Sequence, residues 1–545
     1  MLLITIHFHR SVINRCFDVM KLNWLLSIVL CALYVGAQSQ SAQSVQKKSI
    51  SKEVKNDWHN LDYDSDKIYG TEANRVYTEL VGDKKPKKKI VVAVIDSGVD
   101  IEHEDLKDNI WTNTAEVPDN GKDDDKNGYI DDVHGWNFLV DDSGHDLHYD
   151  NLEATRVLRT HKAVEAGSMP KPDWLTEEMV STSREIYNDN VAEFESMKQL
   201  GDFYLVLDSI LTAQTGDSNY TFEQALELEH DDDPMKSINR VLRAFKLGGI
   251  TKADLKDMYE TGSKFENYYL NFDFVPRTDL KASDKLYGNN HYEGPEADHG
   301  THVSGLIASN RMNDIGSRGI ASPVAEIMVL RAVPDGDERD VDVANAIRYA
   351  VDNGAGIINM SFGKGVSPQE GLVHDAIDYA AKKNVLVVHA AGNDSEDNDV
   401  VSNYPNPYTS PGIKSPTYLT IGASSISKKK DLVASFSNYG DQEVDLFAPG
   451  HNVYSTLPND EYKLLSGTSM AAPVTSGVAA LIWAFHPELT AAQLKDVLMK
   501  SVTALPKKKV KLPGSKDKVR FSELSQSGGV VNAYQAFILA DEMSN

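Results

Sequence analysis

The apolar residues of the chain form short, unbroken runs that alternate with amphipathic stretches. The runs lie at Ile90–Ile95, Gly356–Gly363 and Val385–Asn393, and helical patterns precede the last two at Val341–Asp352 and Val373–Lys383. A strand with no polar face is typical of a parallel sheet that is covered on both sides. The alternation of such strands with helices predicts an α/β fold with a doubly wound, mainly parallel central sheet and helices on both faces.

The pattern changes to long amphipathic stretches between residues 147 and 284. The stretches are Thr176–Leu211, Phe222–Phe245 and Lys252–Tyr269. The sequences TFEQ and TKAD, which begin at Thr221 and Thr251, carry the residues that cap helix N-termini. We therefore expect a helical subdomain inserted into an α/β domain that consists of residues 88–146 and 285–545.

The first forty residues differ from all that follow. Lys21 precedes the apolar run Trp24–Val35, and small residues end that run. This is the pattern of a secretory signal peptide, which we assign to residues 1–37, with Met20 as a better initiator than Met1. A membrane anchor is the rival interpretation, but the run is shorter than the roughly 20 residues of a span. We expect an exported protein with no transmembrane segment after cleavage, located in a periplasm, on a cell surface or outside the cell.

Residues 38–87 form a polar extension ahead of the first apolar run. Its basic run Lys84–Lys89 is a candidate processing site, although a solvated linker is the favoured interpretation. The segment Asn56–Gly70 carries aromatic residues that are unsuited to a disposable linker. We therefore favour an extension that wraps the α/β domain over a short propeptide.

The charge and the cysteines of the chain exclude several classes of function. There are 81 Asp and Glu against 55 Lys and Arg, which gives a formal net charge of -26. Such a chain repels phosphate backbones, so we expect no nucleic acid partner. Both cysteines, Cys16 and Cys31, fall in the expected leader, so the exported chain has neither a disulfide nor a catalytic thiol.

Three polar residues stand where such a fold gathers its working side chains. Asp96 ends the first apolar run, His299 follows a polar loop in DHGTHVSGLIAS, and Ser469 lies in SGTSMAAPVTSGVAALI. Each has a simple explanation by itself. Asp96 ends a strand, His299 begins a surface helix, and Ser469 caps a buried helix with Pro473 in its first turn. Their combination and their order along the chain require another explanation.

The motifs around these residues resemble those of the subtilase family of serine peptidases. VIDSGVD, HGTHVSG and GTSMAAP are similar to the family's catalytic motifs in the family's order, and AAGN is similar to its oxyanion segment. The resemblance covers roughly residues 88–137 and 286–537. It implies that Ser469 is the nucleophile, that His299 is the general base and then the acid, and that Asp96 orients His299. A serine hydroxyl needs such help because it is a poor nucleophile until an imidazole takes its proton.

The resemblance also implies which residues bind the substrate. Asn393 would donate a side-chain N–H to the oxyanion, together with the backbone N–H of Ser469. Two further segments would pair with an extended substrate backbone and form the walls of the S1 pocket, with an asparagine near its base. These positions are Ser361, Phe362, Gly363, Ala390, Ala391, Gly392 and Asn403. Backbone pairing accepts many sequences, so we expect an endopeptidase of modest selectivity acting on proteins or peptides.

The loop DDDKNGYIDD has the residue types of a calcium site. Side-chain oxygens recur at alternate positions, and Gly128 provides the turn. The expected ligands are Asp123, Asp125, Asn127, the Tyr129 carbonyl, and Asp131 or Asp132. An acidic turn is the alternative, and His134 replaces the bidentate glutamate of a true EF-hand. We expect Ca²⁺ to stabilise the fold without joining the chemistry, and we expect no catalytic cofactor.

One departure from the family pattern leaves several interpretations open. About 200 residues separate Asp96 from His299, and the helical block fills this interval. The block is a lid over the substrate site, a docking surface for a partner or second subunit, or an inert insertion, since loop-closure costs rise slowly with length. The leading function is a secreted serine endopeptidase. The alternatives are a catalytically silent or latent peptide-binding protein and a peptide ligase on the same fold.

Overall fold

The computed structural model describes residues 51–227, 233–280, 286–409 and 412–544. The expected signal peptide, 1–37, lies outside the described residues. The described chain divides into two units. The smaller unit is Tyr187–Asn271, and the larger unit takes in the residues before and after it.

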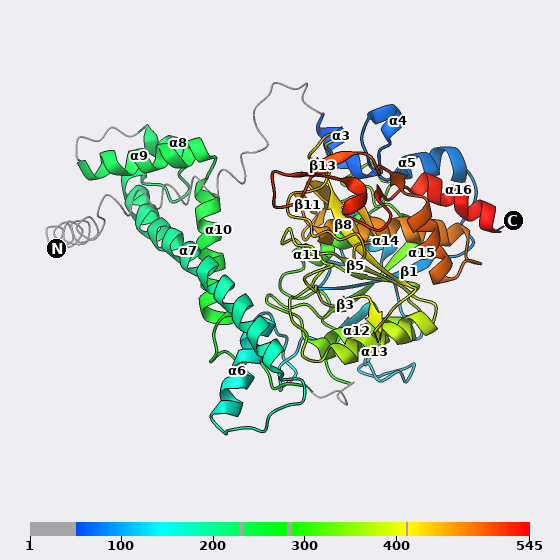
Figure 1. Cartoon of the computed structure of the whole chain (residues 1–545), viewed down its shortest axis with the longest axis horizontal. Helices are drawn as coiled ribbons and strands as arrows, with labels where there is room; N and C mark the ends of the chain where they lie inside the picture. Colours follow the sequence, from blue (N-terminus) through cyan, green and yellow to red (C-terminus); the bar gives the residue numbers. More distant parts are fainter. Residues whose placement is uncertain (1–50, 228–232, 281–285, 410–411, 545) are drawn as a thin grey trace. The chain divides into compact units, whose positions relative to one another are not determined.

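A sheet forms the centre of the larger unit, and its strands β1, β3, β5 and β8 are labelled in Figure 1. It has nine strands in the order β12-β15-β9-β8-β5-β4-β1-β3-β2. Its strands are β1 (Ile90–Asp96), β2 (Gly135–Asn137), β3 (Ala325–Arg331), β4 (Ile357–Met360), β5 (Leu386–Ala390), β8 (Tyr418–Ser424), β9 (Leu446–Pro449), β12 (Thr503–Ala504) and β15 (Gly529–Val530). All neighbours pair in parallel except β12 and β15. The three apolar runs form β1, β4 and β5, so the predicted mainly parallel sheet is confirmed.

Strand β1 shows why these runs have no polar face. Val92 and Val94 contribute to one hydrophobic core, whereas Ala93 and Ile95 contribute to the other. All four side chains are inaccessible to solvent. The strand is buried on both sides because helices cover both faces of the sheet.

Two layers of helices provide this cover. One core contains residues of α11 (Asp298–Ala308), α14 (Thr468–Phe485), α15 (Ala491–Lys500) and α16 (Ala533–Ser544). The other contains residues of α12 (Asp340–Asp352) and α13 (Glu370–Lys382). Within the described residues, α14 is the one helix long and apolar enough to cross a membrane. It is 94% buried inside the protein, which accounts for its apolar composition.

The described part of the N-terminal extension packs into the larger unit. Its short helices are α3 (Lys52–Asp57), η2 (Trp58–Asn60), α4 (Tyr63–Asp66), α5 (Ala73–Arg75) and η3 (Val76–Val81). Trp58 is 1% exposed and joins the same core as α14. The indole Nε1 of Trp58 donates a hydrogen bond to the Asn452 carbonyl at 3.0 Å. The aromatic residues of this segment are therefore part of the folded unit.

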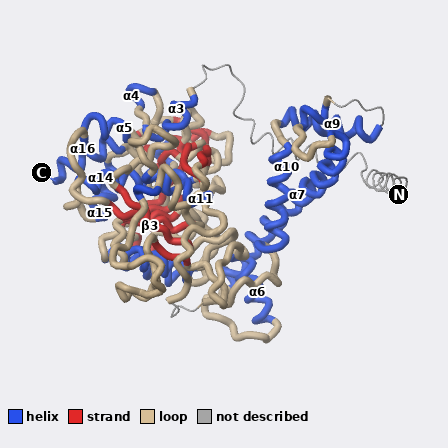
Figure 2. Tube along the Cα trace, turned by 180° about the vertical axis from the view of Figure 1, so that it is seen from behind, coloured by secondary structure: helices blue, strands red, loops and turns tan. Residues whose placement is uncertain are grey.

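The smaller unit is built of helices around a core of its own (Figure 2). The helices between β2 and α11 are α6 (Glu153–Glu165), α7 (Glu177–Thr215), α8 (Phe222–Leu226), α9 (Asp233–Gly248), α10 (Lys252–Lys264) and η5 (Phe265–Tyr269). The predicted capping boxes at Thr221 and Thr251 are confirmed. Helix α6 and the first residues of α7 belong to the larger unit, so the smaller unit is narrower than the expected insertion of residues 147–284.

Short elements complete the larger unit. They are β6 (Tyr408–Thr409), β7 (Ile413–Lys414), β10 (Val453–Leu457), β11 (Glu461–Leu465), β13 (Lys509–Lys511), β14 (Lys518–Arg520), η4 (Lys107–Asn109) and η6 (Phe521–Glu523). The six strands pair as three antiparallel ribbons.

Candidate active site

The structure brings Asp96 and His299 together at the carboxyl end of the sheet. Asp96 is the last residue of β1 and is 2% exposed. Its Oδ1 accepts hydrogen bonds from the Ser97 amide at 2.8 Å and from His299 Nδ1 at 2.7 Å. The His299 side chain, at the start of α11, remains 40% exposed. A buried carboxylate therefore fixes the imidazole by Nδ1 and leaves Nε2 for proton transfer.

The pKa of His299 reflects two opposing influences. Burial of the ring lowers this pKa, but the charge of Asp96 and the hydrogen bond to it raise it. The second influence prevails, so the pKa of His299 lies above its ordinary value. The imidazolium form is therefore stabilised, while the base form needs a somewhat higher pH than for a free histidine.

The second histidine of the HGTH sequence has a different environment. His302 is inaccessible to solvent, and its Nε2 lies 3.1 Å from the Lys463 carbonyl. Burial lowers the pKa of His302 to about 3, so the ring is neutral near pH 7. The geometry thus separates a partly exposed histidine beside a carboxylate from a structural histidine one helical turn away.

Ser469 is the second residue of α14, and its contacts are made with Ser361. The Ser469 hydroxyl donates to the Ser361 carbonyl at 3.0 Å, and the Ser361 hydroxyl donates to the Ser469 carbonyl at 2.9 Å. A regular helix would satisfy the Ser469 carbonyl with the N–H of residue 473, which is a proline without one. The expectation that Pro473 lies in the first turn of the helix is wrong, because Pro473 is the sixth residue of α14. The Ser361 hydroxyl replaces the N–H that the proline lacks.

A chain of buried polar groups supports this contact. The Ser476 hydroxyl donates to Asn359 Oδ1 at 2.9 Å, and Asn359 Nδ2 donates to the Ser361 hydroxyl at 2.9 Å. Asn359 and Ser476 are both inaccessible to solvent. Neither residue was predicted from the sequence, although an asparagine inside the apolar run IINM was a visible signal.

Asn393 lies beside the residue that precedes the serine. Its Oδ1 accepts hydrogen bonds from the Thr468 amide at 2.8 Å and from the Thr468 hydroxyl at 3.0 Å. The Thr468 hydroxyl also accepts a hydrogen bond from the Gly392 amide at 3.2 Å. Because the carbonyl end of the Asn393 side chain is anchored, its Nδ2 group is directed away from Thr468. The role of Thr468 in holding this asparagine was not predicted from the sequence.

Two of the expected substrate-binding segments meet at Asn403. Its Nδ2 donates to the Ala391 carbonyl at 3.1 Å and to the Ala390 carbonyl at 3.3 Å. A Cβ atom added to Gly363 would lie 2.6 Å from Asn403 Oδ1, so this close approach requires a glycine. Gly392 continues the second segment and Phe362 continues the first. The structure thus brings Gly363, Ala390, Ala391 and Gly392 to this asparagine.

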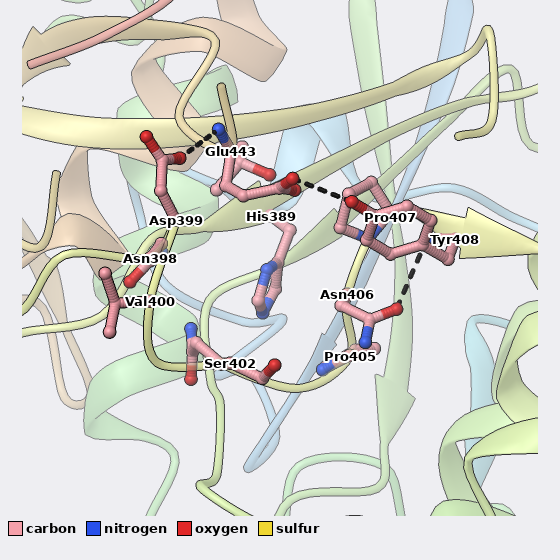
Figure 3. A pocket seen from close by; sticks show the side chains of 12 residues that line it. His389, Asn398, Asp399, Val400, Ser402, Pro405, Asn406, Pro407, Tyr408 and Glu443 are labelled. Carbon is pink, nitrogen blue, oxygen red and sulfur yellow. Dashed lines mark hydrogen bonds between the residues drawn. The ribbon is translucent and has the colours of Figure 1, made fainter. Parts of the chain in front are cut away.

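A cavity of about 160 Å³ adjoins these segments (Figure 3). Its lining includes His389, Ser402, Asn403, Asn406 and Glu443. His389 Nε2 lies 2.7 Å from the Phe362 carbonyl. Burial lowers the pKa of His389 to about 4, so the ring is neutral near pH 7 and its Nε2–H donates to that carbonyl.

The acidic loop provides a group of carboxylates that fits a cation. Oxygens of Glu116, Asp123 and Asp125 lie within 4.8 Å of one another. Backbone amides approach the same carboxylates, among them Gly128 N, which donates to Asp123 Oδ2 at 2.9 Å. Glu116 is 6% exposed and lies outside the loop motif, which is why the sequence pattern did not reveal it.

Other residues of the expected calcium set have internal partners. The two oxygens of Asp131 accept the amides of Asn120 and Gly121 at 3.1 and 2.8 Å. Asp132 accepts hydrogen bonds from the Tyr349 hydroxyl at 2.5 Å and from Asn127 Nδ2 at 2.9 Å. The ring of Tyr129 packs edge-on against Trp136, Phe138 and Tyr349. These contacts fold the loop around Glu116, Asp123 and Asp125.

A carboxylate-bound histidine and a serine at a helix N-terminus are parts of which serine hydrolase sites are built. The model of the subtilase family matches residues 87–521. The chain belongs to the subtilase family of serine proteases.

Individual relatives match over part of their length. The chain is 38% identical over 202 residues to the major intracellular serine protease of Bacillus subtilis (strain 168), which covers 36% of this chain and 59% of that protein. It is 40% identical over 201 residues to the halolysin-like extracellular serine protease Nep of Natrialba magadii, covering 37% and 34%. It is 33% identical over 282 residues to subtilisin-like protease 2 of Plasmodium falciparum, covering 49% and 20%. Each match spans less than two thirds of the relative.

Proposed function

We propose that this chain is a secreted serine endopeptidase that hydrolyses peptide bonds of protein substrates. The observation that carries the proposal is the 2.7 Å hydrogen bond between His299 Nδ1 and the buried carboxylate of Asp96. This bond selects the tautomer whose Nε2 accepts a proton, and the carboxylate stabilises the imidazolium formed in the reaction. Ser469 is the nucleophile.

The first half of the reaction acylates Ser469. Its hydroxyl turns from the Ser361 carbonyl to His299 Nε2, which takes the proton as Oγ attacks the substrate carbonyl carbon. The C–N bond then breaks, and His299 gives the proton to the leaving amine. In the second half, water attacks the acyl-enzyme, loses a proton to His299 and releases the acid. The nucleophile becomes a free hydroxyl again when His299 returns that proton to Ser469.

The oxyanion is stabilised by two N–H donors. Asn393 supplies its Nδ2, because its Oδ1 is engaged by Thr468. The backbone N–H of Ser469 is the second donor, and the N-terminus of α14 favours the developing negative charge. Both donors are fixed before the substrate arrives.

The substrate backbone lies between the two segments that meet at Asn403. The main chains of residues 361–363 and 390–392 would pair with the substrate backbone. Gly363 is exposed to solvent. Main-chain pairing holds an extended peptide whatever its side chains, so the proposed substrates are proteins in general.

We further propose that Ca²⁺ stabilises this fold. Glu116, Asp123 and Asp125 would hold the ion, since hard cations prefer carboxylate oxygens and three carboxylates gathered within 4.8 Å repel one another without one. Binding to the native state adds stability by mass action. An equal melting temperature in excess Ca²⁺ and in EDTA would contradict this proposal.

The test of the enzymatic function is hydrolysis of fluorogenic casein by the chain from Gln38 onward, compared with Ser469→Ala from about pH 5 to 9. The general base must be neutral, so activity should rise with pH. Its apparent pKa should lie above the ordinary histidine value of about 6.5, because Asp96 raises the pKa of His299. Retained activity in Ser469→Ala would reject the mechanism. Mass spectrometry with an added amine distinguishes a ligase, and folded but inactive wild-type protein would indicate a binding function.

A further inference from the structure

A buried ionic network joins α6 to the segment that contacts Ser469. Lys364 lies at its centre and is 5% exposed. Its Nζ lies 2.7 Å from Glu153 Oε2 and 2.8 Å from Asp340 Oδ1. The same Nζ donates to the Glu338 carbonyl at 2.8 Å. These three short, charge-assisted contacts hold the buried ammonium in a single position.

Glu153, the first residue of α6, provides the link to the long stretch between Asp96 and His299. Its carboxylate accepts hydrogen bonds from Arg156 Nε at 3.1 Å and from Arg156 Nη2 at 2.7 Å, besides that from Lys364. Burial raises the pKa of Glu153, but the charges of Arg156 and Lys364 hold it well below its usual range. Glu153 is thus an ionised, buried carboxylate that pairs with two cations.

The main chain of Lys364 is fixed as well. Its amide donates to the Tyr404 carbonyl at 3.0 Å, and the Tyr404 amide donates to the Lys364 carbonyl at 2.9 Å. Ser361, three residues earlier, holds Ser469 by two hydrogen bonds. The segment 361–364 spans at most about 10 Å, so displacement of one end is transmitted to the other.

We propose that Glu153 is a positioning residue for the peptidase reaction, acting through Lys364 on the segment 361–364. The inference rests on the proposed function and adds to it. Without the Glu153 carboxylate, Lys364 keeps Asp340 and Arg156 keeps Asp150 at 3.3 Å, so each cation has one carboxylate in place of two and shifts or admits water. The segment 361–364 moves with Lys364, and with it moves the Ser361 carbonyl that accepts a hydrogen bond from the Ser469 hydroxyl.

The test compares Glu153→Gln with Glu165→Gln in the full chain. Glu165 is the last residue of the same helix, its side chain is 67% exposed, and its partner is His161 at 3.5 Å. The kcat and KM for a short peptide are measured per active site, with the sites counted by a serine-directed burst reagent. We expect Glu153→Gln to lower kcat/KM per titrated site by about 10- to 100-fold with a higher KM, because small misplacements near reacting groups have effects of this size. Glu165→Gln should stay within about twofold of wild type.

A purely structural role gives a different result. Partial unfolding reduces the number of titrated sites but leaves kcat and KM per site unchanged, and that outcome would overturn the proposal. If Glu153→Gln does not fold, the double variant Glu153→Gln, Lys364→Met decides, because it removes one buried anion and one buried cation and leaves the net charge of the network unchanged. Wild-type parameters per site in the double variant would also overturn the proposal, whereas a loss of about 10-fold or more supports it.

The two proposals fail separately in this experiment. A wild-type chain without titratable Ser469 refutes the peptidase function and this inference with it. An active wild-type chain whose Glu153→Gln variant matches Glu165→Gln refutes this inference alone.

Discussion

The stretch between Asp96 and His299 contains two regions of opposite character. Residues 150–186 and 272–280, in the larger unit, are tied to it by buried ion pairs. These pairs are Lys364–Glu153 at 2.7 Å, Arg339–Asp150 at 2.7 Å, and Arg277–Asp342. Residues 187–271 have an apolar core of their own, and ion pairs such as Lys198–Glu266 at 2.8 Å are exposed.

The difference teaches that one continuous insertion in the sequence divides into two parts in the structure, of which only residues 187–271 form a separate unit. A buried charge that loses its partner is strongly destabilising, whereas an exposed pair contributes little. The first region is therefore bound to the rest of the larger unit by ion pairs, and removal of either partner alone would destabilise the protein. The second region is held together by its own apolar contacts.

The largest expected effect comes from two deletions that differ only in their limits. Removing residues 150–281 takes away Asp150, Glu153 and Arg277. We expect no folded protein, because the buried Arg339 and Asp342 lose their charged partners and Lys364 loses one of its two. Removing residues 187–271 and closing the gap with a short Gly-Ser linker should leave the main melting transition and peptide hydrolysis nearly unchanged. The closure is short because the Tyr187 hydroxyl donates to the Leu270 carbonyl at 3.3 Å.

The narrow deletion also tests the role of residues 187–271. A lid predicts a gain on casein and none on a short peptide, a docking surface predicts the loss of a partner or second subunit, and an inert insertion predicts neither. If the narrow deletion unfolds the protein as the wide one does, the contrast between the two regions is wrong.

A single substitution should show the same contrast on a smaller scale. The Asp342 carboxylate is inaccessible to solvent. Arg277→Met removes its cation and leaves it the hydrogen bond from the Tyr287 hydroxyl at 2.6 Å. We expect a loss of about 3 to 5 kcal/mol in the unfolding free energy of the larger unit, measured in denaturant. Lys198→Met is the control in the smaller unit, and it should leave the same transition unchanged. Equal effects of the two variants would show that burial of the pair is unimportant.

The sequence predicted the regular parts of the molecule because they carry local signals. The runs that form β1, β4 and β5 and the boxes at Thr221 and Thr251 are readable from neighbouring residues. The contact between Glu153 and Lys364 was not predictable, because it joins residues 211 apart without any periodic pattern. The limits of the smaller unit were hidden for a similar reason, since α7 runs unbroken across the boundary between residues 186 and 187.

The site shows the same division between local and distant information. Asp96, His299 and Ser469 stand in motifs that a sequence displays. Their supports do not, because Asn359 and Thr468 acquire their roles only when β4, the segment after β5 and α14 come together. Pro473 illustrates the limit well, since its effect depends on the hydroxyl of a residue more than one hundred positions earlier.

The smallest expected effect lies within the smaller unit and tests its independence. The Thr251 hydroxyl accepts a hydrogen bond from the Asp254 amide at 3.2 Å, and Asp254 Oδ2 accepts one from the Thr251 amide at 2.7 Å. Thr251→Ala removes half of this capping box and should destabilise α10 by about 1 kcal/mol. Hydrogen exchange should therefore be faster in α10, while exchange in α14 and peptide hydrolysis stay as in wild type. Faster exchange in α14 as well would mean that the two units unfold together. The stability of the smaller unit would then contribute to that of the larger unit.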